Sequence, residues 1–302
     1  MNGARLVLSL FLVALPAILL PVVRRTQRPR VWAVILSASM GAGFVLVELS
    51  LIHAALPLGL TLLGLDRLAA ACRSLGGHLF GDPVAFGASA GLLAVVIAVS
   101  AFRGVLRSLR VTSELRRGVS GGSVTAVGGQ IAAYLPLGQR WAVAVPGGSP
   151  PVLLSSSLPK ELEYSELTAV VNHEMAHLRH HHVRFLLLGT AVSEGLRFLP
   201  WSRRSMTALR LALELWADES ASARSSEARD AVRSALRKLI SISPSALASA
   251  RLSALEGAGA GGTRRHEWEW ATAVSATVPL VIALAVTLVM HLAQVIQIAS
   301  PT

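Results

Sequence analysis

Residues 173–177 read His-Glu-Met-Ala-His, which fits the pattern H-E-x-x-H at every defined position. On a helix, residues four apart lie on one face, so His173 and His177 can hold one metal ion between them. Glu174 lies to the side of this pair, where its carboxylate can take a proton from a water molecule that the metal activates. These residue types in this spacing predict metal-assisted hydrolysis, with Glu174 as the catalytic base.

The segment before the motif is predicted to be a helix that leads into it. Pro159 stands just ahead of residues 161–172, and acidic residues fill the first turns of that segment. Leu167, Val170 and Val171 provide an apolar face. We therefore expect the motif to lie on a helix that is packed along one side.

A catalytic zinc ion usually has three protein ligands and an open position for water, so the two histidines need a partner. His180, His181 and His182 follow closely. Eight residues of a straight helix rise about 12 Å, however, whereas two ligand atoms on one zinc ion lie about 3 to 4 Å apart. One class of zinc enzymes turns the chain with a glycine and uses a third histidine six residues after the second. That class is excluded, because His180 stands at the glycine position and Val183 at the histidine position.

A better candidate for the third ligand lies further along the chain. Residues 211–223 are rich in Ala and Leu, contain no Gly or Pro, and are predicted to form a helix. Glu214 and Asp218 are four apart and share a face of that helix. We predict Glu214 as the third metal ligand and Asp218 as the acceptor of the free ring N–H of a ligating histidine. Glu194 is the alternative third ligand, but no carboxylate follows it one turn later.

H-E-x-x-H followed by E-x-x-x-D on a later helix resembles the gluzincin clan of zinc peptidases. More narrowly, the chain is similar to the membrane metallopeptidases of the BlaR/MecR family, because residues 142–157 resemble the strand–turn–strand before their zinc helix. The HtpX/Ste-type membrane proteases share both motifs. The resemblance implies an α+β peptidase domain, a Zn²⁺ cofactor and a protein substrate, which in the BlaR/MecR case is a repressor of the BlaI/MecI type. We expect the substrate to pair with an exposed edge of this hairpin.

The chain is 53% hydrophobic over 302 residues, which is too apolar for an ordinary soluble domain. The excess lies in stretches close to the roughly 20 residues that span a bilayer. We predict a membrane α-helical protein whose residues 1–102 hold three transmembrane helices and whose residues 103–270 form the zinc peptidase domain. The four predicted transmembrane helices lie at about residues 6–23, 31–55, 83–102 and 271–299.

The positions of the arginines predict the orientation of these helices. Arginines gather after the first and third helices and before the fourth, so all of these flanks lie in the cytoplasm if four helices span. The zinc domain is then cytoplasmic and both termini lie outside. Splitting residues 31–65 into two spans would move the arginines after the third helix outside, so one long helix with a break near Pro57 is preferred. Attraction of these arginines to anionic lipid accounts for the net charge of +11, and we expect no direct binding of nucleic acid.

Several roles stay open at this point. Arg224, Tyr134 and Tyr164 are the candidates for a further group that stabilises the oxyanion. Glu48 and His53 lie within the second apolar stretch, where ionisable residues either serve function or face other helices near the membrane surface. The physiological substrate, the activating signal and the oligomeric state are not predicted.

We therefore expect a membrane-anchored zinc endopeptidase that cleaves cytoplasmic proteins, with a transcriptional repressor as one class of substrate. An HtpX-like protease of membrane-protein quality control is the first alternative. A non-proteolytic signalling protein is disfavoured because a structural metal site does not need Glu174, and an intramembrane protease is disfavoured because charged residues surround the motif. We expect no penicillin-binding sensor domain, since three residues follow the last apolar stretch.

Overall fold

The computed structural model describes residues 2–76, 83–118, 122–136, 141–223, 225–242 and 244–257. The predicted transmembrane helix at residues 271–299 lies outside these described residues, as does Arg224.

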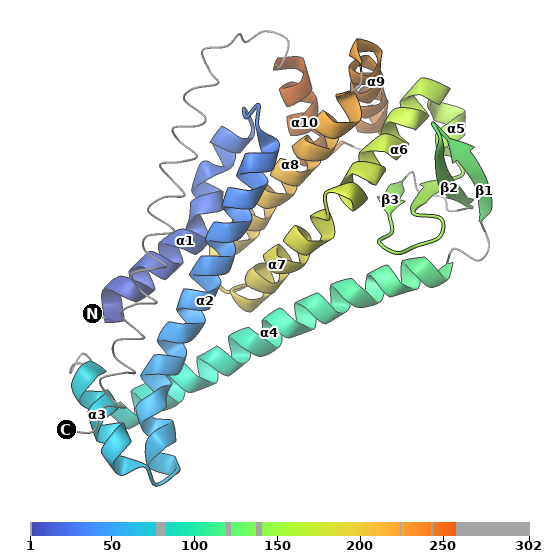
Figure 1. The fold of residues 1–302 in the computed structure, drawn as a ribbon. Helices are drawn as coiled ribbons and strands as arrows, with labels where there is room; N and C mark the ends of the chain where they lie inside the picture. Colours follow the sequence, from blue (N-terminus) through green and yellow to red (C-terminus); the bar gives the residue numbers. More distant parts are fainter. Residues whose placement is uncertain are drawn as a thin grey trace.

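The first part of the chain is a group of long apolar helices (Figure 1). Among the described residues, two helices are long and apolar enough to cross a membrane, and they include the predicted spans at 31–55 and 83–102. The predicted span at 6–23 is present as a shorter apolar helix. By length and composition, these helices are consistent with association with a membrane. They are α1 (Asn2–Val23), α2 (Pro29–Leu62) and α4 (Pro83–Gly118), with α3 (Asp66–Gly76) between the last two.

The expected break at Pro57 is wrong, because α2 is a single helix from Pro29 to Leu62. Proline lacks a backbone N–H and so removes one hydrogen bond of the helix. The helix nevertheless continues on both sides of Pro57. The hydroxyl of Thr61, one turn after Pro57, donates a hydrogen bond to the carbonyl of Pro57. Helix α4 also extends beyond the predicted residues 83–102, so that its second part carries the arginines that follow them.

Helices α1 and α4 pack along different parts of α2. Gly43, near the middle of α2, lies directly against Val13 of α1. Gly87, near the start of α4, lies against Leu58 near the end of α2. The apolar part of α4 therefore lies beside the second half of α2, whereas α1 lies beside its first half.

A four-stranded sheet follows α4, with the strand order β1-β2-β4-β3. The pair β1–β2 is antiparallel, β2–β4 is parallel and β3–β4 is antiparallel, which leaves β3 at one edge. The predicted strand–turn–strand over residues 142–157 is confirmed as β3 and β4. The strands are β1 (Ser123–Val127), β2 (Gln130–Leu135), β3 (Ala142–Ala144) and β4 (Val152–Ser155).

Six helices complete the described chain, and the long helix α6 lies between the sheet and α8 and α9 (Figure 1). Leu167 and Val171 of α6 are buried in one cluster with residues of β4, as their apolar pattern predicts. The predicted start near residue 161 is corrected, because α6 begins at Tyr164 with Glu163 and Glu166 forming a reciprocal capping box. The helices are α5 (Leu158–Glu161), α6 (Tyr164–Arg179), α7 (His182–Gly195), α8 (Pro200–Ser222), α9 (Ser226–Ile242) and α10 (Ala246–Gly257).

One hydrophobic core joins the apolar helices to the part of the chain that carries the motif. Trp32 and Met40 of α2 belong to the same buried cluster as Leu209 and Leu213 of α8. The hydroxyl of Ser205 donates to the carbonyl of Val13 at 2.7 Å, which fixes the first half of α8 to α1. Helix α8 is thus held by α1 and α2 before it reaches Glu214 and Asp218.

The close contact at Gly43 yields a test of this packing. A Cβ at position 43 would lie 2.7 Å from Val13 Cγ2 and 2.8 Å from the carbonyl oxygen of Ser9, so Gly43→Ala should cost about 1–3 kcal/mol of stability. Gly59→Ala in the same helix is the control, because its Cβ would meet no described atom within 4 Å. Thermal unfolding in detergent would measure both variants, and equal melting temperatures would contradict the predicted contact.

Candidate metal centre

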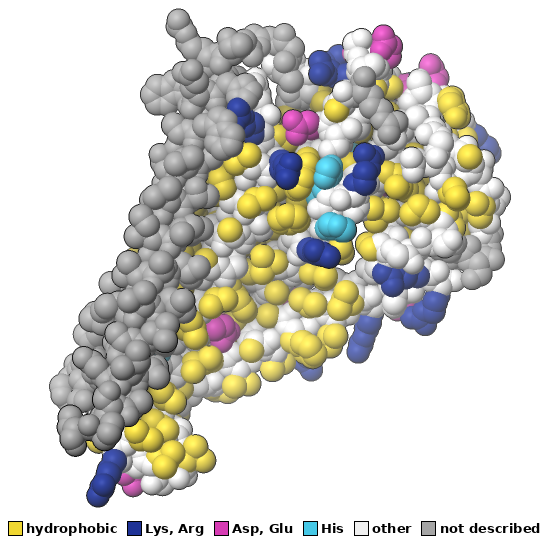
Figure 2. All heavy atoms as spheres, in the orientation of Figure 1, with side chains coloured by type: hydrophobic (Ala, Val, Ile, Leu, Met, Phe, Trp, Pro, Cys, Tyr) yellow, Lys and Arg dark blue, Asp and Glu magenta, His cyan; other side chains and the backbone are white. Residues whose placement is uncertain are grey.

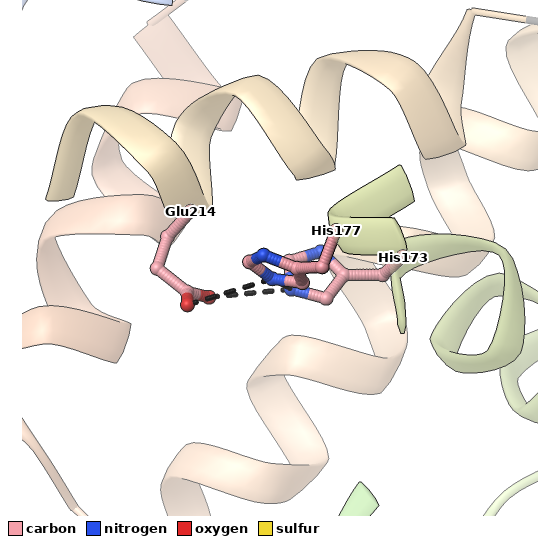
Figure 3. Close-up of side chains that lie close together, drawn as sticks. All are labelled: His173, His177 and Glu214. Atoms are coloured by element: carbon pink, nitrogen blue, oxygen red, sulfur yellow. Dashed lines mark hydrogen bonds and ion pairs between the residues drawn. The ribbon is translucent and has the colours of Figure 1, made fainter. Parts of the chain in front are cut away.

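The structure brings together His173 and His177 from α6 and Glu214 from α8 (Figure 3). His173 Nε2 lies 3.2 Å from Glu214 Oε2 and 3.2 Å from His177 Nε2, and His177 Nε2 lies 3.6 Å from Glu214 Oε1. Two ligands of one tetrahedral zinc ion lie about 3 to 4 Å apart. The three side chains therefore have the donor chemistry and the spacing of a zinc site.

Small residues allow α6 and α8 to approach one another. Ala169 of α6 and Ala221 of α8 belong to one buried cluster. Ala176 and Ala217, near the histidines and carboxylates of the same two helices, are also fully buried. Larger side chains at these positions would move Glu214 away from the histidines, because the helix separation depends on the side chains at the contact.

Asp218 lies where the spacing predicts it, behind His173. Its Oδ1 lies 2.8 Å from His173 Nδ1, and its side chain is almost completely buried. Because Nδ1–H donates to this carboxylate, the lone pair of Nε2 points towards His177 and Glu214. Asp218 thus orients His173 for binding a metal ion.

His182 has the corresponding position behind His177, and the sequence analysis missed this role. His177 Nδ1 lies 2.8 Å from Nδ1 of the fully buried His182. The chain reaches this position because α6 ends at Arg179 and His181 adopts a left-handed conformation (φ 53°), after which α7 starts at His182. Residues 173–182 therefore do not form one straight helix, although His182 is not part of the candidate metal group. With Nε2 of His177 turned towards the metal group, Nδ1–H donates to His182.

Arg251 of α10 completes the centre and was not predicted. Its Nε and Nη2 donate to Asp218 at 2.8 and 2.6 Å, and its Nη1 lies 3.0 Å from Glu214 Oε2. The guanidinium thus holds the predicted ligand and the predicted acceptor at once. No local pattern could have identified this arginine, because it lies 33 residues after Asp218 and comes close only through the packing of α10 on α8 and α9.

The charges of the centre favour a cation between the three candidate ligands. Burial and Arg251 oppose a proton on His173, but Asp218 and Glu214 outweigh them and raise its pKa to about 9. Burial and the charge of His173 lower the pKa of His177 to about 4. Burial would raise the pKa of Glu214, yet the hydrogen bond with His173 and the charge of Arg251 bring it well below its usual range. Two carboxylates and one arginine thus favour a positive charge at His173, and a metal ion bound at its Nε2 could supply that charge in place of the proton.

Glu174 faces a cavity of about 350 Å³ next to these residues. Its Oε2 accepts a hydrogen bond from the backbone N–H of Ala144 in β3 at 2.9 Å. Burial raises the pKa of Glu174 to about 7, against the charge of His173, and Glu214 adds to the increase. Figure 2 shows histidine side chains in the middle of the visible face, with basic side chains around them.

Other candidates from the sequence lie elsewhere. Glu194 packs against Gly104 of α4, where a Cβ would lie 2.7 Å from Glu194 Cγ, and it is not part of the metal group. His180 Nε2 lies 3.0 Å from Ser220 Oγ, and the ring stacks on Trp216. Neither Tyr134 nor Tyr164 lines the cavity at Glu174, and the hydroxyl of Tyr164 accepts a hydrogen bond from the backbone of Gly128.

The comparisons with known proteins agree with this geometry. Residues 141–249 match the model of peptidase family M48. The match begins just before β3, contains all four residues of the predicted catalytic and metal-binding set, and supports a metallopeptidase. Members of this family usually use zinc. No curated protein and no solved structure matches the chain.

The candidate metal group predicts distinct effects of four substitutions. His173→Ala, His177→Ala and Glu214→Ala should each remove zinc from the purified protein, whereas Glu174→Gln should keep zinc and lose proteolysis. Elemental analysis and a peptide-cleavage assay would measure the two properties.

Glu194→Ala is the matched control and should retain zinc, because Glu194 lies against α4. Full occupancy in Glu214→Ala together with loss in Glu194→Ala would contradict the assignment of the third ligand.

The contact between His177 and His182 predicts a weaker metal site in His182→Ala. Loss of such a supporting hydrogen bond typically lowers metal affinity by about 10- to 100-fold. Competition with a chelator would measure the affinity, and His180→Ala is the control because His180 bonds to Ser220. Equal affinities of the two variants would show that His182 does not orient His177.

Proposed function

We propose that the chain is a membrane-anchored zinc endopeptidase that cleaves cytoplasmic proteins at segments held in an extended conformation. The observation that carries this proposal is the place of Glu174. Its carboxylate lies beside the metal group, on the wall of the same cavity, and is bound to the edge strand β3. A general base between a metal group and the outer edge of the described sheet suits the hydrolysis of an extended peptide.

His173, His177 and Glu214 would hold the zinc ion, which when bound lowers the pKa of a water molecule towards neutrality and polarises the scissile carbonyl. Glu174 takes the proton of the attacking water and returns it to the leaving amine. Burial raises the pKa of Glu174, which makes its carboxylate a better proton acceptor. Asp218 and Arg251 keep His173 and Glu214 in position during these transfers.

The edge strand β3 offers the backbone groups that an extended substrate needs. Trp141 accepts a hydrogen bond from Ser155, and Val145 donates one to Pro151, so these two residues face the neighbouring chain segment. Residues between them alternate in direction, which turns the backbone groups of Ala142 and Ala144 to the other edge. The N–H of Ala144 holds Glu174 there. A substrate that pairs with this edge would place its scissile bond next to the general base.

The cavity walls favour an apolar substrate side chain next to the scissile bond. Most of the lining residues are apolar, many of them from α6 and α9, and the volume of about 350 Å³ accommodates a large side chain. The apolar residues that form these walls include Leu158, Val170, Val232, Leu236 and Leu239.

The apolar helices α2 and α4 support the anchoring in a membrane, and the arginines that follow the apolar stretches support a cytoplasmic peptidase domain. The resemblance to the BlaR/MecR family suggests a repressor of the BlaI/MecI type as the substrate. The resemblance to HtpX-type proteases suggests misfolded membrane proteins instead. A non-proteolytic role is disfavoured, because a structural metal site does not need a carboxyl group held at the cavity as Glu174 is.

The two substrate classes can be separated in cells. Comparison of protein fragments between wild type and Glu174→Gln should show one or a few fragments of a transcription factor that vanish in the variant, because Glu174 is needed for the proton transfers. Mass spectrometry of peptide termini would measure them. A broad set of membrane-protein fragments would replace the regulatory role by quality control, and identical fragments in both strains would exclude proteolysis.

A further inference from the structure

The α7–α8 turn, residues 196–204, comprises the connection between the two helices and the first residues of α8, and it carries exposed basic and aromatic side chains. Residues 197–204 read Arg-Phe-Leu-Pro-Trp-Ser-Arg-Arg. Phe198 is 56% exposed, and Arg197, Arg203 and Arg204 are also exposed. Trp201 is partly buried and packs on the core that α8 shares with α1 and α2. Arginines next to large apolar rings are typical of segments that lie at a membrane–water interface.

The position of this turn along α4 indicates where such an interface would be. Gly195, just before the turn, lies against Phe44 of α2 and against Ile97 and Ala101 of α4. Residues 83–102 of α4 contain no charged side chain, and arginines follow from position 103. The turn therefore lies where α4 changes from apolar to basic, which is the pattern of a helix that leaves a bilayer.

The lengths of α2 and α4 agree with a bilayer on one side of this level. Twenty residues of helix, the length of the apolar part of α4, span about 30 Å, which is the thickness of the hydrocarbon layer. The 34 residues of α2 would span about 51 Å, so only part of this helix can lie in hydrocarbon. The contact of Gly87 with Leu58 selects the second half of α2, because this half lies beside the apolar part of α4.

We propose that the α7–α8 turn, residues 196–204, docks on the surface of an anionic bilayer that is crossed by the second half of α2 and the apolar part of α4. Phe198 enters the interface, and Arg197, Arg203 and Arg204 bind lipid phosphates. A bilayer at the level of α1 would instead place these three exposed arginines in hydrocarbon, which is costly. The inference rests on the membrane anchoring proposed above and is independent of the peptidase activity.

Docking of the turn would set the height of the metal centre above the membrane. Helix α8 starts at Pro200 and carries Glu214 fourteen residues later, so the two lie about 21 Å apart along the helix. Substrate segments would then be cut some distance from the membrane surface and not within the bilayer. This expectation distinguishes the protein from an intramembrane protease.

A depth-sensitive fluorophore at position 198 tests the proposal in the full-length chain. Cys72→Ala removes the single native cysteine, and Phe198→Cys in that background accepts the environment-sensitive label NBD. Glu174→Gln is included so that proteolysis plays no part in the result. In vesicles that contain anionic phosphatidylglycerol, the NBD fluorescence should fall when lipids carry a spin label near the headgroup and should change little when the spin label lies at mid-bilayer.

Tyr164→Cys in the same background is the matched control, because Tyr164 is 69% exposed and lies at the start of α6, at the far end from the turn. Its label should be quenched by neither lipid. Replacement of Arg197, Arg203 and Arg204 by Gln should abolish the increase in quenching at position 198 that anionic lipid causes. Quenching at mid-bilayer, no quenching at position 198, or quenching that does not depend on anionic lipid would each overturn the proposal.

Discussion

The buried Asp218 carboxylate is the group on which the geometry of the metal centre depends. It accepts hydrogen bonds from His173 and from Arg251, and Arg251 in turn pairs with Glu214. A buried charge without partners is strongly destabilising, so each member of this network requires the others. The network ties α6, α8 and α10 together, because His173, Asp218 and Arg251 come from these three helices. The positions of the two candidate metal ligands His173 and Glu214 thus depend on Asp218, directly for His173 and through Arg251 for Glu214.

The centre is also connected to the apolar helices through α8. The first half of α8 shares a core with α1 and α2, and the second half carries Glu214 and Asp218. Arg30 at the start of α2 lies over the ring of Trp216, at 5.7 Å from its centroid, and this ring stacks on His180. A change in the packing of α1 on α2 would therefore shift Glu214, because the helix α8 connects the two sites. For the proposed peptidase, such a connection would be a physical route for control by the packing of α1 on α2.

The edge strand β3 has two proposed functions that depend on neighbouring backbone groups. The N–H of Ala144 holds the carboxylate of Glu174, and the neighbouring backbone groups face the edge where an extended substrate would pair. In the proposed mechanism, the general base Glu174 would thus be positioned relative to the substrate as well as relative to the metal. Helix α6 thus carries the proposed base, and the strand β3 fixes the orientation of its carboxylate.

What the sequence by itself determined was local. Helical spacing placed His173 with His177 and Glu214 with Asp218, runs of apolar residues marked the long helices, and the resemblance to the BlaR/MecR family indicated β3 and β4. The tertiary structure decided which of these local features meet. It brought in Arg251 from α10, moved Glu194 against α4, and placed His182 behind His177 by a left-handed turn that sequence spacing does not reveal. The physical reason is that periodicity reports the faces of one element, whereas contacts between elements depend on how side chains distant in the sequence fill a common core.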